Sequence, residues 1–274
     1  YVKQNGSGDG SSWNSPLNNL EVALTRAANI NSVHTDDNDP KRVKKIFVAK
    51  GTYQLASGKS YQMPKNIEIY GGFDPDNAIK NLTHERITGN VNDGSILRGN
   101  NASVIKNDDN SLTGNAVLNG FTITNGNAAN GGGIYNKKVA AKFENCIIRS
   151  NNATANGGAV YNENSNTTWV NCLVINNTAP NGASMYNNAS LPTLLNATIA
   201  DNTGAQGAAL FNANGSSVRI LNSVSVKNSS DIVNNASTPT YENSLIQGLS
   251  GVTSSTSVFD SNYLLLTTSP ALNA

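Results

Sequence analysis

The sequence has little charge, few aromatic rings and very few residues that bind transition metals. Charged residues make up 14% of its 274 residues, aromatic residues make up 6%, and the formal net charge is +1. So neutral a chain lacks the basic field that nucleic acids require, and we expect no nucleic-acid partner. It contains two histidines and two cysteines, and no pair of them has zinc-site spacing. No apolar run reaches the ~18 residues of a membrane span, so we predict that this chain does not cross a membrane.

Asparagine is abundant instead. The chain has 46 asparagines, and 28 of them lie between Asn115 and Asn243. Low charge with much Asn, Gly, Ser and Thr is also typical of disorder. Here, however, apolar residues recur at regular offsets and the asparagines keep register with them. The pattern therefore indicates an ordered repeat.

Two columns of similar segments share one period. The first column has an apolar residue, an aromatic residue and an asparagine in each segment: Ile134-Tyr135-Asn136, Val160-Tyr161-Asn162, Met185-Tyr186-Asn187 and Leu210-Phe211-Asn212. The second column begins with an asparagine in each segment: Asn119, Asn145, Asn171, Asn196 and Asn222. Steps of 25 or 26 residues in both columns indicate a repeat architecture.

The composition of each unit selects the kind of repeat. Each unit holds runs of four to six residues rich in Val, Ile, Thr, Phe and Tyr, which are broken by Gly or Asn. Two amphipathic helices do not fit in such a unit, and a propeller blade needs about 40 residues. We therefore predict an all-β chain, a single-stranded parallel β-helix with coils of about 25 residues.

The N-terminal part has a different character. It holds 25 of the 37 charged residues within positions 1–110. Ser15-Pro16 is a good helix start, and apolar residues then recur at helical spacing through Ala28. An amphipathic helix here would cap the open end of the core, although an ordinary surface helix has the same pattern. We divide the single domain, 1–274, into an N-terminal section with its cap, irregular coils, regular repeats and a C-terminal end: 1–45, 46–114, 115–250 and 251–274.

Stacking at about 4.8 Å per coil gives each column a physical role. Asn119, Asn145, Asn171, Asn196 and Asn222 are predicted to form a structural ladder, because amides above and below satisfy one another. The column of Ile134 should face the core. The next column should face outward, where its rings could form a platform for sugars or lie beneath loops: Tyr135, Tyr161, Tyr186 and Phe211.

Cys146 and Cys172 share a column with Ala197, and we predict two free, buried thiols.

Sites that use carboxylates are weakly indicated. Asp36, Asp37 and Asp39 could hold a calcium ion, but their spacing is not that of an EF-hand, and a solvated loop has the same composition. Asp201 should neighbour Lys227 as a surface ion pair. We find no signature of a catalytic site, and no cofactor other than calcium is indicated.

Several motifs carry a resemblance. Asn151-Asn152-Ala153-Thr154-Ala155-Asn156-Gly157-Gly158-Ala159-Val160 resembles the repeat of chlamydial-type polymorphic outer-membrane proteins. Gly8-Asp9-Gly10-Ser11-Ser12-Trp13, Phe47-Val48-Ala49-Lys50-Gly51-Thr52-Tyr53 and Ile69-Tyr70-Gly71-Gly72-Phe73 are similar to segments of bacterial secreted proteins of the pectin-lyase-like superfamily. The same holds for Ser244-Leu245-Ile246-Gln247-Gly248 and Ser269-Pro270-Ala271-Leu272. The resemblance implies a right-handed parallel β-helix of bacterial type that is exported, often to the outer membrane or cell surface, and adhesin-like.

Three functions remain open at this stage. The first is a non-catalytic extracellular module for adhesion, or for binding a polysaccharide or cell-surface glycan through the aromatic column. The second is a lyase or glycoside hydrolase acting on an acidic polysaccharide, which requires carboxylates that converge in one cleft. The third is a structural spacer in a larger surface protein.

Overall fold

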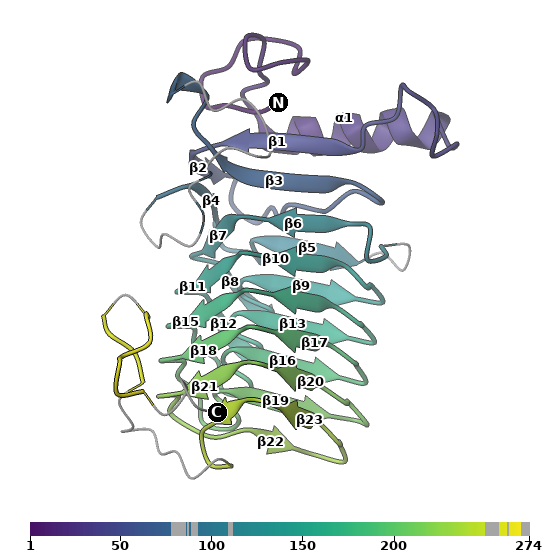
Figure 1. The fold of residues 1–274 in the computed structure, drawn as a ribbon. Coiled ribbons are helices and arrows are strands. Elements are labelled where there is room, and N and C mark those ends of the chain that lie inside the picture. The colour runs from purple at the N-terminus through teal and green to yellow at the C-terminus, as the bar shows by residue number, and fades with distance from the viewer. Residues whose placement is uncertain are drawn as a thin grey trace.

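A computed structural model shows the predicted architecture as one elongated stack of coils (Figure 1). It describes residues 1–77, 86, 88, 93–108, 112–249, 258–261 and 263–269. The chain winds as a right-handed parallel β-solenoid of about 7 turns with about 25 residues per turn. Most of the predicted C-terminal end, 251–274, lies outside the described residues.

Three parallel sheets form the sides of the stack. The first sheet comprises β1 (Lys45–Ala49), β3 (Glu68–Phe73), β6 (Val117–Asn119), β10 (Lys142–Glu144), β14 (Thr168–Val170), β17 (Thr193–Leu195), β20 (Arg219–Leu221) and β23 (Thr240–Glu242). The second sheet comprises β2 (Gly51–Gln54), β4 (Ser95–Arg98), β7 (Phe121–Thr124), β11 (Ile147–Arg149), β15 (Leu173–Ile175), β18 (Thr198–Ala200), β21 (Val224–Val226) and β24 (Leu245–Ile246). The third sheet comprises β5 (Ile105–Asp108), β9 (Ile134–Lys137), β13 (Val160–Glu163), β16 (Met185–Asn188), β19 (Leu210–Ala213) and β22 (Val233–Asn234). A small fourth sheet joins β8 (Asn127–Asn130) to β12 (Asn152–Asn156), and a short 3-10 helix η1 covers Pro75–Asn77.

The corners between sheets use single residues in the left-handed region. Asn145 and Asn171 leave the first sheet with φ angles of 50° and 53°. Asn tolerates this conformation better than most residues, which explains its recurrence at that corner. After the second sheet the same conformation is held by Ser150, Asn176, Asp201 and Lys227. The stack therefore imposes the corner even on Ser150 and Lys227, which disfavour this conformation.

The core column is as predicted. Ile134, Val160, Met185 and Leu210 are each at most 1% exposed. One continuous cluster of buried apolar side chains runs from Val2 near the N-terminus to Ile246 in β24. Within it, Phe143 and Trp169 stack with their ring centroids 4.2 Å apart.

Two asparagine ladders run inside the stack, and the sequence did not reveal that they are buried; of their members only Asn234, at the C-terminal end of the first, is exposed. In the third sheet, each side-chain amide donates to the next side-chain carbonyl at 2.8–3.0 Å, in the order Asn107, Asn136, Asn162, Asn187, Asn212 and Asn234. A second ladder joins Asn151, Asn177, Asn202 and Asn228 at 3.0 Å. Each amide is satisfied by its neighbours, which makes burial tolerable.

The N-terminal helix is present but begins later than predicted. Helix α1 covers Leu20–Val33, and Asn19 caps it by accepting a hydrogen bond from the Val22 backbone at 3.1 Å. Pro16 lies before it, because Leu17 pairs with Val2 in an extended segment. The buried face of α1 consists of Leu20, Ala23, Leu24 and Ala27, which join the core cluster. Figure 1 shows the helix lying across the N-terminal end of the stack beside β1, as expected of a cap.

A C-terminal segment folds back over the outer face of the second sheet. Val258 and Phe259 pack with Ile175, Ala200 and Val226 in a separate apolar cluster. The apolar side chains on this outer face are therefore covered rather than exposed.

Candidate functional site

The aromatic column forms a continuous stack on the outer face of the third sheet. Tyr135, Tyr161, Tyr186 and Phe211 lie in register on β9, β13, β16 and β19. Successive ring centroids are 5.4, 5.5 and 4.9 Å apart, and the ring planes differ by 15° or less. Each such pair adds about 0.5–1.5 kcal/mol beyond area burial, so the stack stiffens this face.

Stacking also determines which part of each ring can be reached. Tyr161 and Phe211 are only 9% exposed, and Tyr135 and Tyr186 are half-buried. Because the faces of neighbouring rings cover each other, what stays accessible is mainly the ring edges. A sugar would therefore lie across a row of edges rather than flat on one ring.

Polar side chains flank the upper part of this column. Lys106 lies over the Tyr135 ring, with its Nζ 5.7 Å from the centroid. The Tyr135 hydroxyl donates to Glu163 at 3.1 Å, and Glu163 also lies 3.4 Å from Lys137. Burial and then the charge of Glu163 raise the pKa of the Tyr135 hydroxyl, so it remains a neutral donor. We call this surface, comprising the four rings with Lys106, Lys137, Glu163 and Asn188, the aromatic face.

The predicted asparagine ladder is visible as side-chain hydrogen bonds at the first corner. Asn145 donates to Asn119 at 3.3 Å, Asn171 to Asn145 at 3.2 Å, and Asn196 to Asn171 at 3.0 Å. Asn222 continues the column in backbone conformation, with a φ of 47°.

The alignment of Asn119 needs a correction. In the strand register Asn119 pairs with Glu144, and Gly120 takes the left-handed position that Asn145 holds one coil later. The corner residue equivalent to Asn145 is therefore Gly120 and not Asn119, so the step between these two coils is one residue shorter than the step from Asn119 to Asn145.

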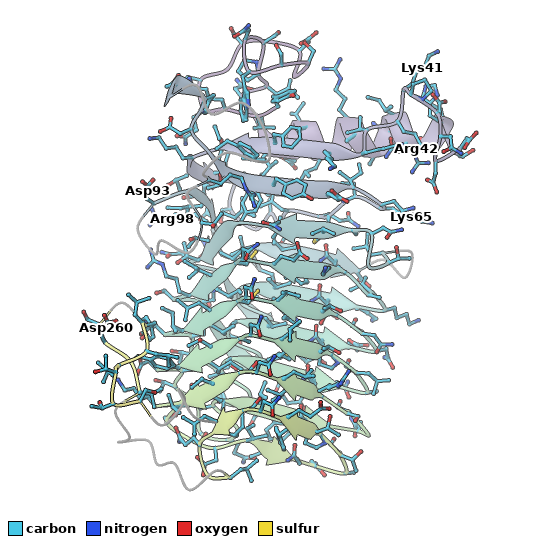
Figure 2. All side chains as sticks on the ribbon, viewed as in Figure 1. Lys41, Arg42, Lys65, Asp93, Arg98 and Asp260 are labelled. Atoms are coloured by element: carbon cyan, nitrogen blue, oxygen red, sulfur yellow. The ribbon has the colours of Figure 1, made fainter. Side chains whose placement is uncertain are left out.

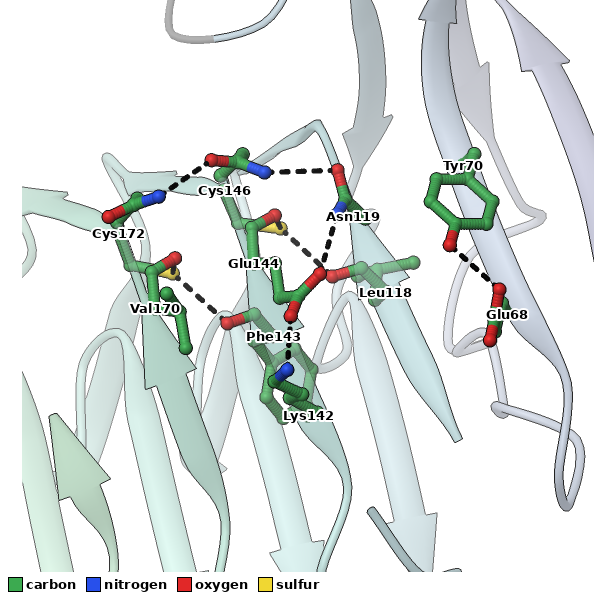
Figure 3. Close-up of polar contacts among 12 residues, drawn as sticks. Glu68, Tyr70, Leu118, Asn119, Lys142, Phe143, Glu144, Cys146, Val170 and Cys172 are labelled. Atoms are coloured by element: carbon green, nitrogen blue, oxygen red, sulfur yellow. Dashed lines mark hydrogen bonds and ion pairs between the residues drawn. The ribbon is translucent and has the colours of Figure 1, made fainter. Parts of the chain in front are cut away.

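A second polar cluster lies on the outer face of the first sheet and was missed by the sequence analysis. Glu144 accepts a hydrogen bond from Asn119 at 2.7 Å and pairs with Lys142, and Tyr70 donates to Glu68 at 2.7 Å (Figure 3). Arg86 donates to Asn119 at 2.7 Å, and its guanidinium lies 5.3 Å from the centroid of the Tyr70 ring.

No local motif links these residues, because Arg86 comes from a connection outside the repeats. Every charge of the cluster has an opposite or hydrogen-bonding partner within it. The cluster therefore stabilises the outer surface of β3, β6 and β10.

The carboxylates of the regular repeats do not converge. Glu144 lies on the first sheet and Glu163 on the third, as their different columns predicted. Asp201 lies at a corner and accepts a hydrogen bond from Tyr263 at 2.7 Å. The expected Asp201–Lys227 pair is thus replaced by a contact with the C-terminal segment, which no repeat pattern could foresee. These three acids cannot act together as an acid–base pair.

Asp36, Asp37 and Asp39 lie in the loop after α1, and each has a separate partner. Asp39 contacts His34 Nδ1 at 2.7 Å, Asp37 lies 3.4 Å from Arg42, and Asp36 accepts from the Asn38 backbone at 2.9 Å. In the part of the chain that the structure describes, no three His, Cys, Asp or Glu residues are grouped closely enough to hold a metal ion. Calcium binding by this loop stays a prediction.

Cys146 and Cys172 are free and buried, as predicted. Their thiols contact backbone carbonyls, with Cys146 3.6 Å from Leu118 O and Cys172 3.5 Å from Phe143 O (Figure 3). Burial raises the pKa of the Cys172 thiol, which makes it a poor nucleophile.

In comparisons with known protein families, curated proteins and solved structures, none matched this chain. Among the described residues, no helix has both the length and the apolar character required to cross a membrane.

Proposed function

We propose that this chain is a non-catalytic extracellular or cell-surface module that binds a glycan along the aromatic face. The observation that carries the proposal is the unbroken stack of four rings on one lateral side of the solenoid. Rings that are already fixed by stacking lose little conformational entropy when a ligand binds. The resemblance of the repeat and N-terminal motifs to exported β-helix proteins supports the extracellular location.

The polar groups beside the rings supply the second half of a sugar site. Sugars present apolar C–H faces and many hydroxyls, so they are bound by aromatic groups together with hydrogen-bonding side chains. The side chains of Lys137 and Glu163 are 35% and 24% exposed, and Asn188 follows in the same row. A glycan chain running along the solenoid axis would meet a ring edge and a polar group in each coil.

The test is the affinity of a double variant, Tyr161→Ala with Tyr186→Ala. We expect at least tenfold weaker binding of a glycan selected on the wild-type protein, with circular dichroism showing an intact solenoid. Tyr161→Leu with Tyr186→Leu keeps apolar bulk and serves if the alanine variant unfolds.

A matched control removes apolar side chains from another lateral face of neighbouring coils. Val170→Ala with Leu195→Ala alters the outer face of the first sheet and should leave the affinity within twofold. If the folded tyrosine variants bind as well as the wild-type protein, the aromatic face is not the site.

A further inference from the structure

The segment around Tyr61, which pairs with Ile105 at the N-terminal edge of the third sheet, leaves an unpaired backbone edge beside the cap helix. The Tyr61 backbone N–H donates to Val104 O at 2.9 Å, and its carbonyl accepts from the Lys106 N–H at 2.8 Å. Both groups therefore point toward β5. Successive peptide groups of a parallel strand point to opposite edges, so those of Gln62 point toward α1. Within the described chain, neither the N–H nor the carbonyl of Gln62 makes a backbone hydrogen bond.

A groove lies between this edge and α1. It consists of two adjoining hollows of about 420 and 400 Å³, which share Ala28 and Lys65 as lining residues. Leu24, Tyr61 and Met63 lie at its base and are almost completely buried, and the accessible lining beside them is of mixed polar and apolar character. From Glu21 to Ser32 the helix wall is about 16 Å long, which is the length of about five residues of an extended strand.

The two ends of the groove carry opposite charges. Glu21 is at the Tyr61 end, where its charge helps to raise the pKa of the Tyr61 hydroxyl, after the larger effect of burial. Lys65, Arg42 and Asp37 line the other end. Arg42 is largely buried and pairs with Asp37 at 3.4 Å, which leaves the positive charge of Lys65 at this end. Figure 2 shows Lys41, Arg42 and Lys65 on the same side of the molecule, beside the end of α1. Arg42 is held there by hydrogen bonds of 3.0 Å to the His34 and Thr35 carbonyls.

We propose that this groove binds an extended peptide segment of a partner protein, which adds a short parallel strand to the third sheet at Gln62. An unpaired backbone N–H and C=O along the side of an open groove is the arrangement that strand addition uses. A peptide that runs parallel to residues 60–65 places its carboxyl-terminal end beside Lys65. An acidic side chain or a terminal carboxylate at that end matches the charge of Lys65, and Glu21 at the other end matches the amino-terminal side of the peptide.

The experiment compares two substitutions at the edge residue. A phage-displayed library of random heptapeptides is selected on the wild-type protein, and the enriched peptide is titrated by fluorescence polarisation. Gln62→Pro removes the N–H and should weaken binding at least tenfold. Gln62→Ala keeps the backbone donor and should bind within twofold of wild type. Lys65→Glu should also weaken binding at least tenfold.

A second variant guards against misfolding at the edge. Thr25 is exposed on the groove side of α1, so Thr25→Trp fills the groove without altering residues 60–65, and it should abolish binding. The tyrosine double variant of the aromatic face should keep full peptide affinity, which separates this proposal from the proposed glycan site. The proposal is overturned if the library yields no enriched peptide, or if Gln62→Pro and Gln62→Ala bind equally. The peptide proposal is also overturned if the groove binds a glycan and Gln62→Pro leaves that glycan affinity unchanged.

Discussion

The buried ladder of the third sheet predicts a large effect for one small substitution. Asn162 is completely buried, accepts from the Asn136 amide at 3.0 Å and donates to Asn187 at 2.9 Å. Asn162→Ala leaves a donor without an acceptor on one side and an acceptor without a donor on the other. Each buried unpaired group costs about 1–3 kcal/mol, so the free energy of unfolding should fall by about 2–6 kcal/mol.

The assay uses a tryptophan that is connected to the same residue. The Trp169 indole donates to Thr167 Oγ1 at 2.9 Å, and Thr167 lies 3.4 Å from Asn162 Oδ1. In a Trp13→Phe background, Trp169 fluorescence reports urea unfolding near the substituted coil. The denaturation midpoint should shift strongly while the slope stays constant.

An exposed ladder in a neighbouring strand gives the control. Asn152 in β12 donates to Asn127 at 3.0 Å on the surface, so Asn152→Ala should cost under about 0.5 kcal/mol. If Asn162→Ala and Asn152→Ala lower the free energy of unfolding equally, burial of the ladder is not what makes it stabilising.

Two further predictions concern a corner and a tyrosine. Gly157 has a φ of +66°, and a Cβ there would lie 2.3 Å from Val160 O, whereas a Cβ on Gly215, with a φ of +75°, would meet open space. In urea unfolding, Gly157→Ala should therefore destabilise the protein by about 1–3 kcal/mol more than Gly215→Ala. Equal losses of stability would contradict this geometry. Burial and the hydrogen bond to Glu68 raise the pKa of Tyr70 to about 12, above the ~10 of an unfolded tyrosine. Its stabilisation should be complete below pH 10 and lost as the pH rises from about 10 to 12. Tyr70→Phe should lose less stability than wild type over that range, and parallel curves for the two proteins would refute the assignment.

The coils could be predicted from the sequence because each coil places the same type of residue at the same position. Residues such as Ile134 and Val160 occupy one apolar column, and Asn145 and Asn171 occupy one corner. Once the period is known, stacking at one coil per step follows for every position. The strict alternation of in and out along β9 and β13 then placed the tyrosines on the outer face.

What could not be predicted depends on contacts outside the period. The sequence analysis assigned no orientation to Asn162, whose burial depends on the amides of Asn136 and Asn187 that pair with it. Arg86 reaches Asn119 from a connection with no repeat, and Tyr263 reaches Asp201 across 62 residues of sequence. The start of α1 shifted to Leu20 because pairing of Leu17 with Val2 outweighed the helix-start signal of Pro16.

In the function proposed above, this solenoid binds glycans without converting them. It is tested most directly by a glycan-array screen of the folded protein with and without calcium, with a parallel assay for unsaturated or reducing-end products. We predict binding that is lost with Tyr161→Ala and Tyr186→Ala, and no product. Product formation, or no binding to any glycan on the array, would contradict the proposed function.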